Sequence, residues 1–373
     1  MRARRLRTLP VSAIGLGCLG LSEYHPGRDT KSTPALHRAL DLGITLFDTA
    51  DSYGDRVNEH LVGRALAGRR DQVVVATKFG VERIPYGTGT RINGRPDYVR
   101  AACDASLRRL GLDVIDLYYQ HHVDPDVPIE ETWGAMADLV AAGKVRHLGM
   151  VDAGPEMIRR ADAVYPVTAV QTEYSVGTRA PEVNGVLDTC RELGIGLVAR
   201  SPLGRGLLAG AGRDLPGLAA RDIRRADPRF AVGELATHRT LADRLASIAK
   251  GRGCTVAQLA IAWLLHQGFD IVPIPGTGLL HHLHDNAEAT TVFLDATDLG
   301  TIDHAAPVTP AGQRQDASLL STRSLASATG PATWLWSDPC FRDSIRSADA
   351  ARGPVRSAVP SRRGRCAPAG SGS

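Results

Sequence analysis

The chain has 373 residues, of which 43% are hydrophobic and 23% charged, and its net charge is +4. This is the composition of an ordinary globular protein, and so small a charge gives no reason to expect a nucleic-acid partner. The six cysteines show no CxxC or metal-ligand spacing, which favours a reducing compartment over a disulfide scaffold. No apolar run approaches the ~18 residues of a membrane span, and the basic N-terminus lacks the long apolar stretch of a signal peptide. We therefore expect a cytoplasmic protein.

Eight apolar, β-branched runs predict strands that are buried on both faces. They span residues 13–17, 45–49, 73–78, 116–121, 145–150, 169–174, 196–201 and 271–276. Helical patterns lie between these runs, and Thr33 and Thr255 are the expected N-caps of two of the helices. The basic segment before the first run is expected to form a solvated strand or hairpin.

Strict alternation of strands and helices predicts a parallel sheet covered by helices. Eight such units in residues 1–316 fit a closed (β/α)8 barrel of the TIM type. The competing architecture is an open doubly wound sheet, which needs a GxGxxG turn between a strand and a helix. The segment "GLGCLG" at 15–20 resembles that turn only superficially, because no helical pattern follows it.

Two segments do not fit the repeating pattern. The stretch from Gly204 to about Phe230 is long for a barrel loop and is typical of a lid or a binding loop. Residues 317–373 are rich in Ser, Ala, Arg, Gly and Pro and show little periodicity. Since such a composition cannot bury much of a core, we expect an irregular, disordered C-terminal tail.

Four polar residues lie at or just after the ends of three consecutive predicted strands. They are Asp48 and Tyr53 in "LFDTADSYGD", Lys78 in "VVVATKFG" and His121 in "DLYYQHHVDP". A barrel would bring these strand ends to one rim, where active sites of this fold lie. Tyr53 would be the proton donor, with its pKa lowered by the Lys78 ammonium, and Asp48 would balance that charge. His121 would donate a hydrogen bond to a carbonyl oxygen as it becomes negative.

The chain resembles the aldo-keto reductase family from about Leu6 to Gln315. The similarity rests on motifs such as "DTADSYG", "ATKFG", "RPDYVRAACDASLRRLGLDVIDLYYQH", "GKVRHLG", "SPLGRG" and "VPIPGT". The resemblance implies carbonyl reduction with NADP(H) as the cofactor. It also implies that Tyr53 is the general acid, that Lys78 and Asp48 tune it, and that His121 orients the substrate carbonyl.

The same resemblance implies a set of cofactor contacts. Gln171 would bind the nicotinamide carboxamide, the backbone at 201–204 would wrap the pyrophosphate, and Asp285 and Asn286 would reach the adenine. The full set comprises Gly17, Cys18, Leu19, Asp48, Val151, Asp152, Gln171, Arg200, Ser201, Leu203, Gly204, Gly206, Ile274, Gly276, Thr277, Asp285 and Asn286.

Three positions depart from the family pattern. Val151 stands where a serine usually holds the carboxamide, and Arg200 stands where an aromatic ring usually stacks on the nicotinamide. After Thr277 the family usually has Lys and Arg for the 2′-phosphate of NADP, but here the run is "GLLHHLHDN". His281 and His282 would be weaker substitutes at neutral pH, so NAD(H) is the alternative cofactor.

Two other functions are open at this point. The altered nicotinamide contacts and the unusual tail are consistent with a cofactor-binding sensor or scaffold that does not turn over. A metal-dependent hydrolase would use His121, His122 and Asp124 with the histidines near 281, although we expect no metal. For the reductase, Tyr24 and Tyr86 are candidate substrate contacts, and the protein would be a monomer or a homo-oligomer acting on a small carbonyl compound without nucleic acid or membrane.

Overall fold

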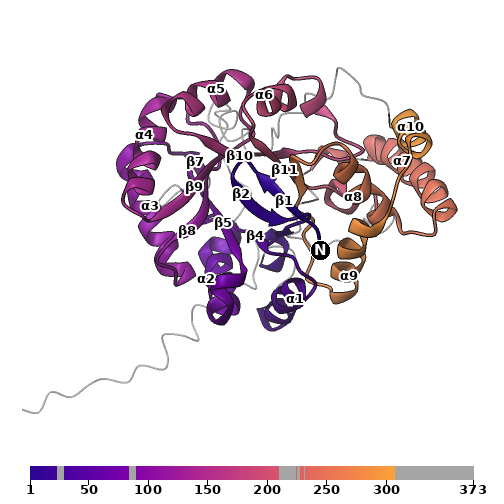
Figure 1. Ribbon diagram of the computed structural model, residues 1–373, viewed down its shortest axis with the longest axis horizontal. Coiled ribbons are helices and arrows are strands. Elements are labelled where there is room, and N and C mark those ends of the chain that lie inside the picture. Colours follow the sequence, from indigo (N-terminus) through magenta and orange to yellow (C-terminus); the bar gives the residue numbers. More distant parts are fainter. Residues whose placement is uncertain (23–28, 84–89, 210–223, 225–226, 231, 307–373) are drawn as a thin grey trace, which may run out of the picture. The chain divides into compact units, whose positions relative to one another are not determined.

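The computed structural model describes residues 1–22, 29–83, 90–209, 224, 227–230 and 232–306. Within these residues, eight parallel strands form the centre of the fold (Figure 1). In sheet order they are β3 (Leu16–Gly17), β4 (Leu46–Asp48), β5 (Val74–Phe79), β8 (Ile115–Gln120), β9 (Val145–Val151), β10 (Val167–Glu173), β11 (Gly196–Arg200) and β12 (Ile271–Pro273).

Backbone hydrogen bonds join the two ends of this sheet. Gly15 N donates to Pro273 O at 2.9 Å, and Gly17 N donates to Pro275 O at 3.3 Å. A Cβ at Gly17 would lie 2.9 Å from Ile274 O, and one at Gly276 would lie 2.8 Å from Gly17 O. The first and last strands therefore approach so closely that only glycine fits at both positions. The predicted barrel is confirmed, and the open doubly wound sheet is not what the chain forms.

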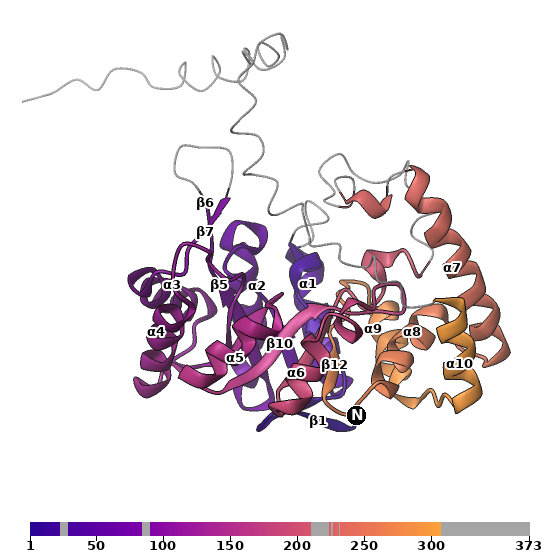
Figure 2. The same ribbon diagram turned by 90° about the horizontal axis from the view of Figure 1, so that it is seen from above.

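An N-terminal β-hairpin covers the end of the barrel at which the strands begin. It consists of β1 (Ala3–Leu6) and β2 (Leu9–Ser12), and Figure 2 shows it on the side opposite to the β6–β7 hairpin. Leu6, Leu9 and Val11 are buried against barrel-interior residues such as Leu46 and Val198. The hairpin was expected. Its outer face is exposed at Ala3, Arg5 and Pro10, in line with the expected solvation, but its inner face closes the barrel core, which was not expected.

Helices on the outside of the barrel follow the strands. They are α1 (Asp29–Asp41), α2 (Val57–Leu66), α3 (Pro96–Leu110), α4 (Ile129–Ala141), α5 (Pro155–Val164), α6 (Val186–Glu192), α8 (Val256–His266) and α9 (Leu280–Glu288). The short 3-10 helices are η1 (Leu19–Leu21), η2 (Tyr53–Arg56), η3 (Ala67–Gln72), η4 (Ala180–Glu182), η5 (Gly204–Gly206), η8 (Pro228–Phe230) and η9 (Ala289–Thr291).

The two expected N-caps differ in outcome. Thr255 caps α8 in a capping box, in which its Oγ1 accepts from Gln258 N at 3.1 Å and Gln258 Oε1 accepts from Thr255 N at 2.9 Å. Thr33 does not cap α1, because that helix already begins at Asp29 and contains Pro34. Its first residues are polar and carry no apolar period, so the sequence pattern hid this first turn.

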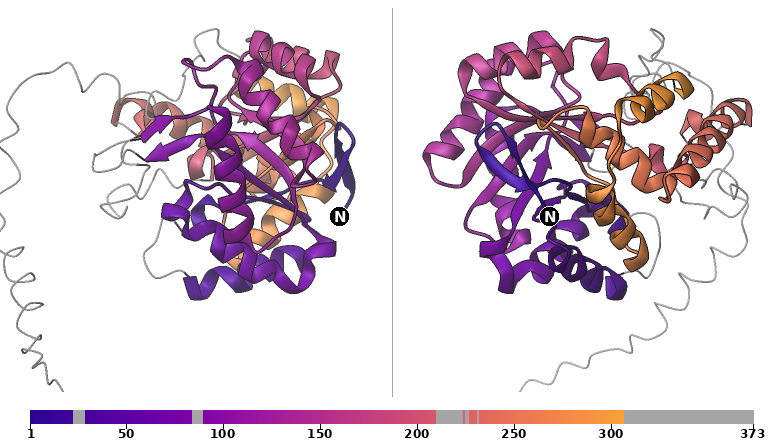
Figure 3. Two further views of the ribbon diagram at one scale, coloured as in Figure 1. Left: turned by 90° about the vertical axis from the view of Figure 1, so that its left-hand side faces the viewer. Right: turned by 45° about the vertical axis from the view of Figure 1, so that its right-hand side comes forward.

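Four further elements of the fold were not expected from the sequence. Helices α7 (Val232–Gly251) and α10 (Ala296–Ala305) pack against each other beside α8, as Figure 3 shows. Strands β6 (Val81–Arg83) and β7 (Thr90–Ile92) form an antiparallel hairpin after β5. The predicted tail, residues 317–373, and most of the long segment after Gly204 lie outside the described residues. None of the helices seen in the described ranges has the length and apolar character needed to cross a membrane.

Candidate active site

The structure brings the four candidate catalytic residues together at one rim of the barrel. Asp48 is the last residue of β4, Lys78 lies near the end of β5, and His121 directly follows β8. Tyr53 opens η2 in the connection after β4. Because β4, β5 and β8 are adjacent in the sheet, the four side chains share the end at which the strands finish.

Lys78 connects the members of this group, because it is bonded to both Asp48 and Tyr53. Its side chain is fully buried, and its Nζ donates to Asp48 Oδ1, to Thr49 O at 2.8 Å and to Tyr53 Oη at 3.3 Å. These three bonds use all three hydrogens of the ammonium. The second oxygen of Asp48 accepts a hydrogen bond from Gln171 Nε2 at 2.8 Å. The group therefore has a fixed geometry in which the lysine points at the phenol.

The charges of this group set the protonation states. Burial alone would lower the pKa of Lys78, but Asp48 and Tyr53 together outweigh it, and the pKa lies above its ordinary value. Burial raises the pKa of the Tyr53 phenol, and the Lys78 ammonium opposes the rise without reversing it. The expected net lowering of the Tyr53 pKa is thus wrong for this structure, since desolvation of the phenolate is the larger effect.

His121 is an uncharged imidazole in this environment. Burial, followed by the positive charge of Lys78, holds the pKa of His121 well below its usual range. Its ring lies edge-on to Tyr53, with centroids 6.0 Å apart, and stacks on His122 at 5.0 Å. The buried Nδ1 of His121 has no hydrogen-bond partner among the described residues. A neutral ring in this position can donate one N–H to an oxygen atom beside Tyr53.

Buried polar residues at the start of α2 hold the loop that carries Tyr53. Asn58 Oδ1 accepts from Thr49 Oγ1 at 2.6 Å, and Asn58 Nδ2 donates to Cys18 O at 2.9 Å. Glu59 accepts from Thr77 Oγ1 at 2.7 Å and from Arg109 Nε at 2.6 Å. Sequence reasoning missed both residues, although polar side chains on the inward face of an otherwise apolar helix were a usable signal.

The backbone just after Tyr53 is left-handed over three residues. Gly54, Asp55 and Arg56 have φ values of 55°, 53° and 72°. Asp55 and Arg56 pay a steric cost of about 1–2 kcal/mol each in this conformation. Since strained backbone of this kind gathers at functional sites, the turn supports a role for Tyr53 in the chemistry.

The candidate cofactor residues lie around the same rim. Val151 ends β9, Asp152 follows it, Gln171 lies in β10, and Arg200 ends β11. The remainder follow the ends of β3, β11 and β12 or lie in α9: Gly17, Cys18, Leu19, Ser201, Leu203, Gly204, Gly206, Ile274, Gly276, Thr277, Asp285 and Asn286. Cys18 and Asn286 are buried, and the backbone N–H and C=O of Cys18 are already bonded to Asp48 O and Asn58 Nδ2. Gly17 and Gly276 are required by barrel closure in any case.

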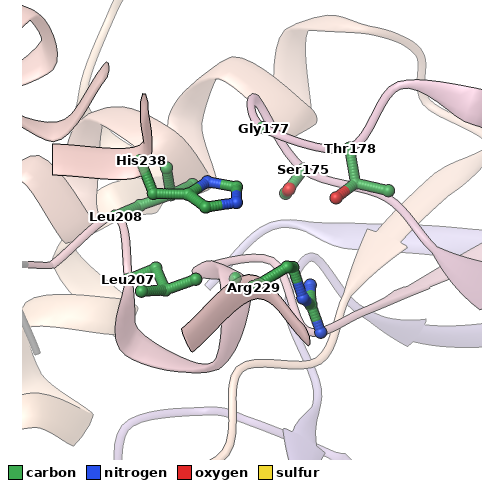
Figure 4. A pocket seen from close by; sticks show the side chains of 8 residues that line it. Ser175, Gly177, Thr178, Leu207, Leu208, Arg229 and His238 are labelled. Atoms are coloured by element: carbon green, nitrogen blue, oxygen red, sulfur yellow. The ribbon is translucent and has the colours of Figure 1, made fainter. Parts of the chain in front are cut away.

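The positions after β11 have a backbone suited to a close approach. Ser201, Gly204, Arg205 and Gly206 all have positive φ, with values of 51°, 58°, 56° and 96°. Beside them lies a small hollow lined by Ser175, Gly177, Thr178, Gly204, Leu207, Leu208, Arg229 and His238 (Figure 4). The buried Ser175 Oγ has no partner among the described residues, and the hollow has the size and polarity for a bound water molecule.

Two other expectations concern the substrate contacts and the metal-dependent hydrolase. The candidate substrate contacts Tyr24 and Tyr86 lie outside them. Among the residues that are described, no group of three His, Cys, Asp or Glu side chains is arranged to hold a metal ion. His284 is instead bonded to Arg38, with Arg38 Nε 3.0 Å from His284 Nε2. The hydrolase alternative therefore has no support from the arrangement of these histidines.

The model of the aldo/keto reductase family matches residues 13–307. The chain belongs to this family. It is 44% identical to a protein described as probable aldo-keto reductase 1 of Glycine max, over 80% of this chain and 86% of the relative. Members of the family are enzymes, and this aldo-keto reductase is accordingly an oxidoreductase.

Solved structures of the family agree with this assignment. A glycerol dehydrogenase from Gluconobacter oxydans has a TM-score of 0.75 and 27% identity, and the match covers 83% of this chain and 98% of that protein. An aldo/keto reductase from Klebsiella pneumoniae, solved with NADP and acetate, has a TM-score of 0.66 and 28% identity over 82% of this chain and 95% of the other.

Proposed function

We propose that this aldo-keto reductase uses NADP(H) to reduce a small aldehyde or ketone to an alcohol, with Tyr53 as the general acid. The observation that carries the proposal is the bonding of one buried ammonium, Lys78 Nζ, to both Asp48 and Tyr53 Oη at the rim. The phenol, the ammonium and the neutral His121 then face one point at which a carbonyl oxygen could lie.

The residues present are suited to a nicotinamide cofactor. The wall opposite Tyr53 combines the buried, apolar Val151 with the planar guanidinium of Arg200, and both can contact a flat ring. The positive-φ backbone after β11 would let a phosphate approach closely. When bound, the cofactor would supply the hydride, which no side chain can deliver.

In the reaction, the protein itself would donate a proton to the substrate oxygen and stabilise the negative charge that develops on that oxygen. The raised pKa of Tyr53 keeps its phenol protonated at neutral pH, so Oη can give a proton to the substrate oxygen. His121 donates its N–H to the same oxygen as negative charge develops there. After the proton leaves Tyr53 Oη, the Lys78 ammonium stabilises the phenolate at 3.3 Å.

The choice between NADP(H) and NAD(H) depends on residues at the start of α9. His281 and His282 are exposed there, with ring centroids 4.3 Å apart. Although His282 is exposed, partial desolvation of its ring, followed by the neighbouring His281, lowers its pKa, so the ring offers little positive charge at neutral pH. NADP(H) is our proposal because relatives of known structure were solved with it, and NAD(H) is the alternative.

The test is oxidation of NADPH and of NADH by the purified protein with an activated aromatic aldehyde. Tyr53→Phe should lower the rate by about 100-fold or more, the usual contribution of a general acid. Tyr118→Phe is the matched control, because Tyr118 is a buried tyrosine of the helix-facing core, where it stacks on Phe79 on the outer face of the sheet. A fully active Tyr53→Phe protein would refute the mechanism, and cofactor binding without turnover would favour the sensor or scaffold function.

A further inference from the structure

A chain of ion pairs crosses the rim on the side facing Tyr53. Its members alternate in sign in the order Asp152, Arg200, Glu173, Arg229, Asp227, Arg205. Arg200 is bonded on both sides, with one nitrogen 2.9 Å from Asp152 Oδ2 and the other 3.3 Å from Glu173 Oε2. The remaining pairs tie Glu173 to η8 and to η5 after β11. The guanidinium of Arg200 is thus held by two carboxylates from the ends of β9 and β10.

The ion-pair chain is largely shielded from solvent. Its side chains are between 5% and 26% exposed, and that of Arg200 is 19% exposed. Pairs this buried hold their geometry, because removing one partner leaves an uncompensated charge. The two carboxylates hold the planar guanidinium of Arg200 through its N–H groups, and a guanidinium plane is a group that stacks on flat rings.

The strand register places Arg200 one layer nearer the mouth than the Lys78 group. Gln171 pairs in register with Val198, and Glu173 pairs with Arg200. Gln171 and Glu173 point to the same side of β10, because side chains alternate along a strand. Gln171 is bonded directly to Asp48 at 2.8 Å. Arg200 therefore lies just above the layer in which the catalytic group and the opposite wall meet.

The positive charge of Arg200 reaches the reacting groups. It contributes to the lowered pKa of His121 and opposes the rise in the pKa of Tyr53. A carbonyl held by Tyr53 and His121 must lie about 3–3.5 Å from the carbon that gives the hydride. The nicotinamide ring must then occupy the space between these residues and the wall that carries Arg200.

We propose that Arg200 makes this site bind the reduced nicotinamide cofactor more tightly than the oxidised one. The inference rests on the proposed function. The oxidised ring carries a positive charge and the reduced ring does not. A guanidinium that lies nearer to the ring than its two carboxylate partners therefore disfavours only the oxidised form. A site of this kind favours carbonyl reduction, because it binds the reduced cofactor tightly and releases the oxidised cofactor more readily.

The test compares dissociation constants of NADPH and NADP⁺, measured by fluorescence and by calorimetry, in four proteins. In Arg200→Met, the ratio of the NADP⁺ constant to the NADPH constant should fall by about tenfold. In Asp152→Asn the ratio should rise, because Arg200 then loses one compensating carboxylate. Arg252→Met is the matched control. This arginine is also paired with two carboxylates, Asp295 and Asp298, but it lies at no strand end, and its loss should leave both constants unchanged.

A fall in the ratio for Arg200→Met together with a rise for Asp152→Asn would establish the electrostatic role, and the reverse pattern would overturn it. An unchanged ratio in Arg200→Met, or shifts in the same direction in both variants, would overturn the inference while leaving the proposed reductase intact. If Arg200→Met does not fold, a fall or no change in the ratio for Asp152→Asn would overturn it equally. A wild-type protein that binds neither cofactor would refute the proposed function itself, and this inference with it.

Discussion

Asp51 is a buried carboxyl group whose ionisation opposes folding. It lies between Asp48 and Tyr53, is 8% exposed, and its backbone N–H donates to Lys78 O at 3.1 Å. Its Oδ1 has no hydrogen-bond partner among the described residues. Burial, reinforced by the neighbouring Glu59, raises the pKa of Asp51 from 3.8 to about 7, and the arginines at 56 and 109 only partly oppose this shift.

The raised pKa makes stability fall as the pH rises. Between about pH 4 and pH 7 the folded protein binds the Asp51 proton more tightly than the unfolded chain does, so each added pH unit lowers the free energy of unfolding. A shift of about 3 pH units corresponds to a cost of roughly 4 kcal/mol above pH 7, at 1.36 kcal/mol per unit. At pH 5 the cost is only about 1.5 kcal/mol, because the folded form is still protonated.

Asp51→Asn should remove this cost without changing the shape of the side chain. Urea unfolding at pH 5 and at pH 8.5 should show the variant more stable than the wild type at both, with a gain about 3 kcal/mol larger at pH 8.5. The exposed Asp113, changed to Asn, is the control for the loss of one carboxylate. An equal gain at the two pH values, or a loss of stability at pH 8.5, would refute the reasoning.

Three further outcomes are expected. Thr255→Ala should lower the free energy of unfolding by about 1 kcal/mol in urea titrations while leaving kcat unchanged, because the capping bond from Gln258 N to Thr255 Oγ1 is lost; no change would mean that water replaces it. Gly63→Ala should cost at least about 2 kcal/mol and lower the Tm, since its Cβ would lie 2.2 Å from the backbone oxygen of Leu110; a wild-type Tm would show that α2 and α3 can separate freely. Gln171→Leu should lower kcat/KM by about tenfold and the free energy of unfolding by about 1–3 kcal/mol, because the buried Asp48 Oδ2 loses its donor; unchanged kinetics would assign the contact to structure alone.

The sequence was sufficient for the barrel and for one half of the site. β-Branched runs predicted every strand of the central sheet, and motifs at three strand ends predicted that Asp48, Lys78 and His121 would meet. Helix α7 was missed even though Leu235, Ala242, Leu245 and Ala249 form a buried stripe at helical spacing. There the signal was present, but polar residues on the other face obscured it.

The rest of the site depends on which strand ends face each other across the barrel. Nothing in the sequence indicates that Gln171 would form a hydrogen bond with Asp48, which lies 123 positions earlier. The ion pairs of Arg200 likewise join the ends of three strands, β9, β10 and β11, that are far apart in the sequence. The direction of the Tyr53 pKa shift could not be predicted from the sequence either, because it depends on whether burial raises the pKa more than the Lys78 charge lowers it.

The hydrogen bond from Gln171 to Asp48 has a mechanical consequence. In the closed ring of eight strands, β10 and β4 are four steps apart in either direction, so this bond spans the full width of the barrel. The bond fixes the distance between two sides of the barrel mouth. One side carries Asp48 and the proton donor Tyr53, and the other would hold the nicotinamide ring. The distance between these two sides then depends on the Gln171 side chain as well as on the backbone. A substitution at residue 171 would therefore change the distance over which the hydride is transferred.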